Sequence, residues 1–110
     1  MPSVNQARVA NSLLAALPRA EYQRLLTGIE PVTLTFGEVL YQPGEPIRHT
    51  YFPTNCLVSL LAVVEGRTVL EVGLVGSEGM VGIPLALGIG VSSIRALVQR
   101  TGTAMRMKSA

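Results

Sequence analysis

Several residue types that support enzymatic chemistry are scarce in this 110-residue sequence, which has no aspartate, no tryptophan, one histidine and one cysteine. A single cysteine, Cys56, excludes an internal disulfide and a cysteine-rich metal site. Its apolar neighbours favour a buried, inert side chain over a redox-sensing thiol. His49 alone cannot supply a metal site that needs several imidazole ligands, and nothing places a nucleophile beside it. The seven glutamates occur singly, so no spacing indicates a general acid and base pair, and we expect no enzyme.

Charge is also sparse: 15% of the residues are charged, and the formal net charge is +2. The nine basic residues are scattered from Arg8 to Lys108 without a run. Phosphate recognition needs several cations on one face, so the sequence does not predict that this chain binds nucleic acid by itself. Hydrophobic residues make up 48% of the chain, which is enough for the core of one domain.

One stretch, from Gly79 to Ile94, carries no charge and raises the question of a membrane span. A spanning helix needs about 20 apolar residues, and this stretch is shorter. Its glycines and Pro84 also make a poor helical composition. We therefore expect buried strand and tight loop, with no membrane contact. The N-terminus has no convincing signal peptide, so we expect a cytoplasmic chain.

The first 30 residues predict short helices. Asn11 is placed to cap a first helix, and Pro18 to begin a second one. Gly28 is a candidate cap at the end of that second helix. The residues at helical spacing, which predict one buried face of the second helix, are Tyr22, Leu25, Leu26 and Ile29.

From residue 31 to residue 110 the pattern changes to short strands, each closed by glycine or proline. We expect strands at 32–36, 39–41, 49–52, 56–64, 68–74, 95–99 and 103–107, with turns at Pro43-Gly44 and Glu65-Gly66. The run 56–64 is apolar except for Ser59, which suits a strand covered on both faces. The predicted fold class is mainly β: a jelly roll (31–110) behind short N-terminal helices (1–30), forming one domain over 1–110.

A glycine-rich segment interrupts these strands. Gly73, Gly76, Gly79 and Gly82 are three residues apart, a spacing that lets the backbone curl and expose N–H groups to an anion. Arg95, at the start of the next strand, would add a guanidinium contact. The alternative is that the glycines only turn corners in a barrel.

Several segments in order resemble the cyclic-nucleotide-binding-type sensor domain of Crp/Fnr-type transcription regulators, and the resemblance covers nearly the whole chain. The segments are the helical lead-in 13–18, the signature Gly37-Glu-Val-Leu-Tyr-Gln-Pro-Gly-Glu45, the strand Tyr51-Phe-Pro53, the cassette Gly79-Met-Val-Gly82 and the strand Arg95-Ala-Leu-Val98. The resemblance implies a double-stranded β-helix whose cassette binds a cyclic nucleotide. In that family a glutamate after the first cassette glycine holds the ribose, and a nearby arginine pairs with the phosphate.

The sequence departs from that pattern at both positions. Met80 stands where the resemblance places the ribose glutamate, Glu78 lies before the glycine, and the segment between Gly82 and Arg95 is longer. Loss of a charge-assisted hydrogen bond of about 1.5–3 kcal/mol weakens affinity roughly 10- to 150-fold. We therefore predict a degenerate cassette that binds another small-molecule effector or none, with no resident cofactor. The candidate ligand-binding residues are Glu78, Gly79, Met80, Gly82, Arg95 and Ala96.

The resemblance also implies a dimerisation helix and a DNA-reading helix-turn-helix after the sensor domain. This sequence ends at Ala110, before either, so we expect DNA contact only through a domain outside it. The alternative function is a structural or self-association module with an empty pocket. On either hypothesis we expect a homo-oligomer.

Overall fold

The structure is a computed structural model that describes residues 11–25, 27–64, 68–82 and 94–108. Two short helices, α2 (Ser12–Ala16) and α3 (Arg19–Leu25), lead into the sheets. The predicted cap is confirmed, because the Asn11 side chain accepts hydrogen bonds from two backbone N–H groups of α2. Within the described ranges, no helix is long and apolar enough to cross a membrane.

The second helix is shorter than predicted. It ends at Leu25, and the Gly28 N–H donates to the Leu25 carbonyl as the chain turns. The prediction that Ile29 lies on this helix is wrong, because Ile29 is the first residue of strand β1 (Ile29–Leu34). The strand thus begins before residue 31 and includes Pro31. Because β1 is an edge strand, a proline there need not cost a ladder hydrogen bond. Leu26 lies outside the described residues.

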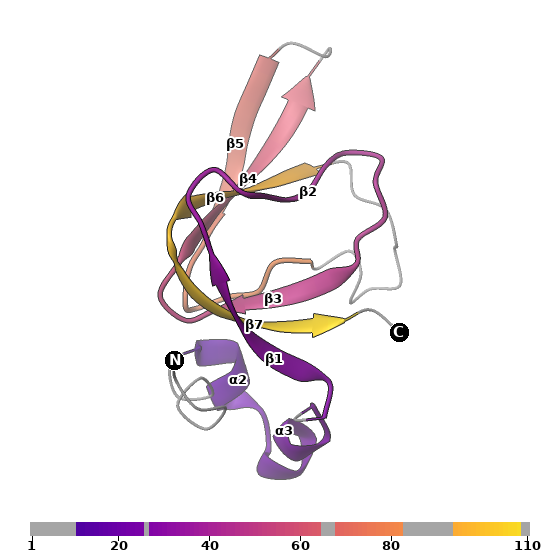
Figure 1. Cartoon of the computed structure of the whole chain (residues 1–110), viewed down its shortest axis with the longest axis vertical. Helices are drawn as coiled ribbons and strands as arrows, with labels where there is room; N and C mark the ends of the chain where they lie inside the picture. Colours follow the sequence, from indigo (N-terminus) through magenta and orange to yellow (C-terminus); the bar gives the residue numbers. More distant parts are fainter. Residues whose placement is uncertain (1–10, 26, 65–67, 83–93, 109–110) are drawn as a thin grey trace.

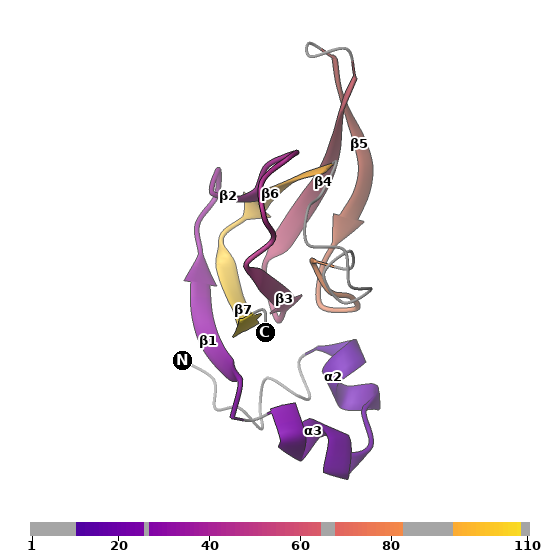
Figure 2. The same cartoon turned by 90° about the vertical axis from the view of Figure 1, so that its right-hand side faces the viewer.

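Seven strands, matching the seven predicted ones, form two antiparallel sheets in the described part of the chain (Figure 1). The three-stranded sheet has the order β1-β7-β3, with β7 (Gly102–Lys108) between β1 and β3 (His49–Pro53). The four-stranded sheet has the order β2-β6-β4-β5 and consists of β2 (Val39–Tyr41), β6 (Ile94–Arg100), β4 (Leu57–Val64) and β5 (Thr68–Val75). The two sheets form the predicted jelly roll. The helices lie at the outer side of the three-stranded sheet (Figure 2).

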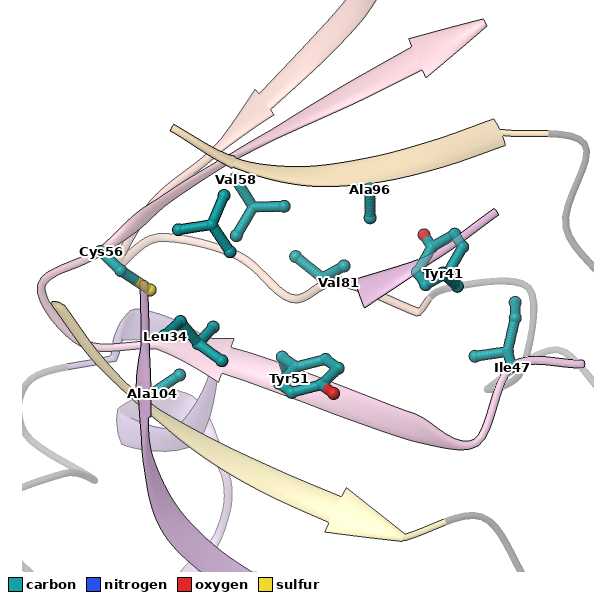
Figure 3. Packing of buried hydrophobic residues seen from close by; sticks show 10 residues of the cluster. Leu34, Tyr41, Ile47, Tyr51, Cys56, Val58, Val81, Ala96 and Ala104 are labelled. Atoms are coloured by element: carbon teal, nitrogen blue, oxygen red, sulfur yellow. The ribbon is translucent and has the colours of Figure 1, made fainter. Parts of the chain in front are cut away.

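The main core fills the space between the two sheets (Figure 3). Its buried residues are Leu34, Tyr41, Ile47, Tyr51, Cys56, Val58, Val81, Ala96, Val98 and Ala104. Every strand except β5 supplies at least one of them, and Val75 of β5 packs against the cluster. This core joins the sheets, because each strand turns alternate side chains toward it.

A second cluster joins the three-stranded sheet to the helices. Its buried residues are Leu14, Tyr22, Ile29, Phe52 and Met105. Strand alternation explains the division, since Tyr51 and Ala104 face the main core while their neighbours Phe52 and Met105 face the helices. The sheet is therefore buried on both faces where the helices cover it.

Two further local predictions are confirmed. The Pro43-Gly44 turn closes with a hydrogen bond of 3.2 Å from the Glu45 N–H to the Gln42 carbonyl, and Gly44 has a positive φ of 83°. Val58 and Ser59 point to opposite faces of β4, and both are fully buried, as expected for a strand covered on both sides. The predicted turn at Glu65-Gly66 lies outside the described residues.

Candidate functional site

The glycine segment forms a tight turn directly after β5. The Gly79 N–H donates to the Gly76 carbonyl at 3.2 Å, which closes the turn. A Cβ at Gly76 would meet both the Glu78 carboxylate and a methyl group of Leu57 at 3.0 Å. A Cβ at residue 76 would therefore be crowded, and the ends of these two flexible side chains would have to shift, whereas Gly73 has only ordinary contacts within β5.

Glu78 folds back onto this turn. Its Oε1 accepts a hydrogen bond of 3.0 Å from the Gly76 N–H, and the bond lowers the pKa of the carboxyl. The side chain is exposed and holds its own turn in shape. The Gly76 N–H is consequently not free to bind an anion while Glu78 occupies it.

Beyond the turn the chain enters the main core. Val81 and Tyr51 exchange two backbone hydrogen bonds, each of 2.8 Å, in an isolated bridge. Gly82 follows with a φ of 108°, in the region that favours glycine. A Cβ there would meet the His49 carbonyl at 3.1 Å and Thr50 at 3.2 Å. The segment Val81–Gly82 is therefore held against β3. Residues 83–93, which follow it, lie outside the described residues.

Met80 is directed toward the helices. Its side chain packs against the helix-side cluster, whereas its neighbour Val81 is buried in the main core. Met80 therefore contributes to the contact between the turn and the N-terminal helices. Its role as the counterpart of a ribose-binding glutamate stays a prediction.

Arg95 and Ala96 do not form one site with each other. Ala96 is fully buried in the main core opposite Leu60, so Arg95, one residue earlier in β6, points to the other face of the sheet. There its Nε donates to the Gln42 side-chain oxygen at 2.8 Å. Consecutive residues of a strand point to opposite faces, so this separation could have been predicted from the sequence, although both residues were predicted to belong to one site.

A polar group at the end of the three-stranded sheet escaped the sequence analysis. Glu30, Arg106 and Tyr51 lie side by side on β1, β7 and β3 in direct register. The Arg106 guanidinium donates to a Glu30 carboxylate oxygen at 2.9 Å from Nε, and again from Nη2. His49 lies next to this group, with its ring centroid 6.0 Å from that of Tyr51. Side chains of a strand alternate between its two faces, so Glu30 lies on the same face of β1 as Leu34, and Arg106 on the same face of β7 as Ala104. Leu34 and Ala104 belong to the main core.

The electrostatics of this group follow from the arginine. The hydrogen bond from Arg106 lowers the pKa of Glu30, and burial raises the pKa of Tyr51. Partial burial and the nearby guanidinium lower the pKa of His49, which favours the neutral imidazole. The group therefore presents a paired charge and an imidazole ring beside the point where Gly82 passes His49.

Metal and thiol chemistry find little support in the described residues. They contain no group of three or more histidine, cysteine or acidic residues that could hold a metal ion. Cys56 is fully buried in the main core, and burial raises the pKa of its thiol. A protonated, inaccessible thiol is a poor nucleophile, which agrees with the expectation that Cys56 is a buried, inert side chain.

Comparison with known proteins identifies the fold. No family model and no curated protein matches the sequence. Solved structures do match, among them the N-terminal domain of a transcriptional regulator from Streptomyces coelicolor, with 21% identity, a TM-score of 0.75 and coverage of 97% of this chain and 74% of that one. The sensor domain of the transcriptional regulator DNR from Pseudomonas aeruginosa matches with 15% identity and a TM-score of 0.75, over 96% of this chain and 71% of that one.

A third match carries a ligand. The regulatory domain of Toxoplasma gondii PKA in complex with cAMP aligns with a TM-score of 0.81 and 11% identity, over 96% of this chain and 41% of that one. This chain has the cyclic-nucleotide-binding jelly-roll fold. At these identities the match establishes the fold and leaves the ligand open. This chain also spans less than half of the Toxoplasma chain, so nothing of that whole protein's activity follows from the fold.

Proposed function

We propose that this chain is the ligand-sensing regulatory domain of a Crp/Fnr-like transcription regulator, with a degenerate cassette that does not bind cyclic nucleotides tightly. The observation that carries the proposal is the jelly-roll fold over nearly the whole chain, which it shares with the N-terminal domain of one transcriptional regulator and the sensor domain of another. In this proposal the chain acts by binding a small-molecule effector in the cytoplasm. DNA recognition belongs to a domain outside this sequence.

The described part of the site supports a departure from cyclic-nucleotide recognition. Arg95 is bonded to Gln42 on the face of β6 opposite the main core, so it is badly placed to pair with a phosphate inside the barrel. One oxygen of the Glu78 carboxylate accepts a hydrogen bond from the Gly76 N–H, which holds the side chain against its own turn. Arg106, the guanidinium on the core side of the three-stranded sheet, is neutralised by Glu30.

Calorimetric titration of the purified chain with cyclic AMP and cyclic GMP tests this proposal. We expect no micromolar binding, and the Arg95→Ala variant should behave like the wild type. A ligand present at 100 times its Kd stabilises a protein by about 2.7 kcal/mol, so thermal denaturation gives an independent readout of binding. Micromolar binding that disappears in Arg95→Ala would contradict the degenerate cassette and restore a cyclic-nucleotide sensor.

A second function, self-association, is favoured by the exposed strand β5. This strand is an edge of the four-stranded sheet, and the β4–β5 hairpin projects from the barrel (Figure 1). Its exposed hydrophobic residues, each 45–57% exposed, are Val69, Leu70, Val72 and Leu74. Its one charged side chain, Glu71, accepts a hydrogen bond of 2.6 Å from Ser59. Exposed edges normally carry lysine or proline, and β5 has neither, so a second copy of this strand is a suitable partner.

Sedimentation equilibrium distinguishes this second function. We expect the wild-type chain to dimerise with rising concentration and Val72→Lys to stay monomeric, because a lysine on each copy would bring like charges together. Phe36→Lys is the matched control, since Phe36 is also exposed but lies outside β5. A wild-type chain that remains monomeric at all soluble concentrations would eliminate self-association.

A further inference from the structure

Asn11 is a polar side chain with no exposed surface, and every hydrogen-bonding position of its amide is used. Its Oδ1 accepts from the Leu13 N–H at 3.0 Å and from the Leu14 N–H at 3.1 Å. Its Nδ2 donates to the Pro53 carbonyl at 2.7 Å and to the Gly79 carbonyl at 3.0 Å. A primary amide has two donor hydrogens and two acceptor lone pairs, so this side chain is fully satisfied.

These bonds join three parts of the fold that are far apart in sequence. The acceptor oxygen holds the first turn of α2, one donor bond reaches the end of β3, and the other reaches the glycine turn after β5. The Ser12 N–H adds a second link, since it donates to the Ser77 carbonyl of the same turn at 2.7 Å. The start of α2 is therefore bound to the glycine turn at two points.

Hydrophobic contacts reinforce the same junction. Leu14 is fully buried in the helix-side cluster, and Met80, next to the glycine turn, packs against that cluster. Separation of the turn from α2 would break the two hydrogen bonds and expose this contact together. The Asn11 amide has no exposed surface, so an N–H group of that amide that lost its acceptor would be left without a partner, and intermediate arrangements are disfavoured.

We propose that Asn11 is a positioning residue that couples the glycine turn, residues 76–79, to the N-terminal helices, so that the two segments open together. The coupling is a property of the fold without any ligand. As a route by which the candidate cassette would signal to the helices, it rests on the proposed sensor function. Asn11 acts through the backbone of the turn and is not itself assigned to the ligand.

Hydrogen exchange of single amides, measured by NMR on the ligand-free chain, tests the coupling. The reporter of the turn is the Gly79 N–H, which is bonded to Gly76, and the reporter of the helix is the Ala15 N–H, which is bonded to Asn11. The Val98 N–H, which lies in the four-stranded sheet and is bonded to the Glu38 carbonyl, serves as the reference.

The first variant is Asn11→Ser, which keeps a capping oxygen for α2 but removes both amide donors to Pro53 and Gly79. We expect exchange at Gly79 to rise at least about tenfold relative to Val98, with a smaller change at Ala15, since subglobal openings are reported separately by each amide.

A double-mutant cycle separates coupling from a merely local role. Ala15→Gly weakens the exposed side of α2 without touching the turn. With Asn11 present, Ala15→Gly should speed exchange at both Ala15 and Gly79. With Asn11→Ser, its effect on Gly79 should be clearly smaller, because of the two hydrogen bonds only the one from the Ser12 N–H to the Ser77 carbonyl still joins α2 to the turn. An equal effect on Gly79 in both backgrounds, or no effect in either, would overturn the proposal.

A variant of equal size tests the two donor bonds a second time, and slow exchange at the Val98 reference shows whether each variant is folded. Asn11→Asp preserves the volume and the helix cap but places a carboxylate oxygen against the Pro53 and Gly79 carbonyls. It should release the turn at least as strongly as Asn11→Ser does. These experiments use no effector. Their outcome therefore does not depend on the cyclic-nucleotide titration, and the coupling and the proposed function can fail separately.

Discussion

Replacement of Phe52 by alanine should lower the free energy of unfolding by about 3–5 kcal/mol, the range for removal of a buried aromatic side chain. Phe52 is 7% exposed and stands opposite Met105 in the register of β3 and β7. Its ring fills the cluster that joins the sheet to α2 and α3. The loss is large because the surrounding side chains come from both helices and two strands, which cannot all move to close the cavity.

Urea denaturation of the two phenylalanine variants measures this effect. The control is Phe36→Ala, because Phe36 is the second phenylalanine of the chain and is 68% exposed. We expect a change of no more than about 0.5 kcal/mol for Phe36→Ala, as for most surface substitutions. A graded variant, Phe52→Leu, should lose clearly less than Phe52→Ala because it leaves a smaller cavity. Equal midpoints for Phe52→Ala and Phe36→Ala would show that the helices do not dock on this sheet.

The strands were predictable because their signals are local. Alternation of apolar and polar residues and the punctuation by glycine and proline located every strand to within a few residues. Ile29 was assigned to the wrong element because it falls at helical spacing after Tyr22 and Leu25, and spacing alone cannot show that the helix has already ended. The decision depends on the pairing of Ile29 with Met107, which is remote in sequence.

The site was less predictable, because its contacts are remote in sequence. Asn11 was identified as a helix cap, but its donors reach carbonyls 42 and 68 residues away, and nothing in the sequence indicates them. The pairing of Glu30 with Arg106, 76 residues apart, is likewise a product of sheet register. The separation of Arg95 from Ala96 is different. Neighbours in a strand point to opposite faces, so the sequence alone could have shown that Arg95 and Ala96 lie on different faces of β6.

Replacement of Gly102 by alanine should destabilise the chain by about 3 kcal/mol, at the upper end of the usual cost of overpacking. A Cβ at Gly102 would meet three atoms of Asn55, two of them backbone atoms at 2.7 and 2.8 Å. Real Cβ atoms do not approach so closely, and backbone atoms cannot rotate away as the end of a long side chain does. The Asn55 side chain also accepts hydrogen bonds from the Thr103 N–H and hydroxyl, so a displacement of Asn55 would break them.

Thermal denaturation of Gly102→Ala and Gly73→Ala compares two strand glycines with different surroundings. We expect the melting temperature to fall by about 15 °C for Gly102→Ala, from a shift of roughly 4–8 °C per kcal/mol in a domain of this size. Gly73→Ala should leave it unchanged or slightly higher, because a Cβ there makes only ordinary contacts with Leu60, at 3.5 Å or more, and alanine reduces the freedom of the unfolded chain. Similar melting temperatures for the two variants would mean that the close approach of β7 to Asn55 does not exist in solution. Since β7 is the central strand of the three-stranded sheet, the packing of β1 and β3 around it would then need revision as well.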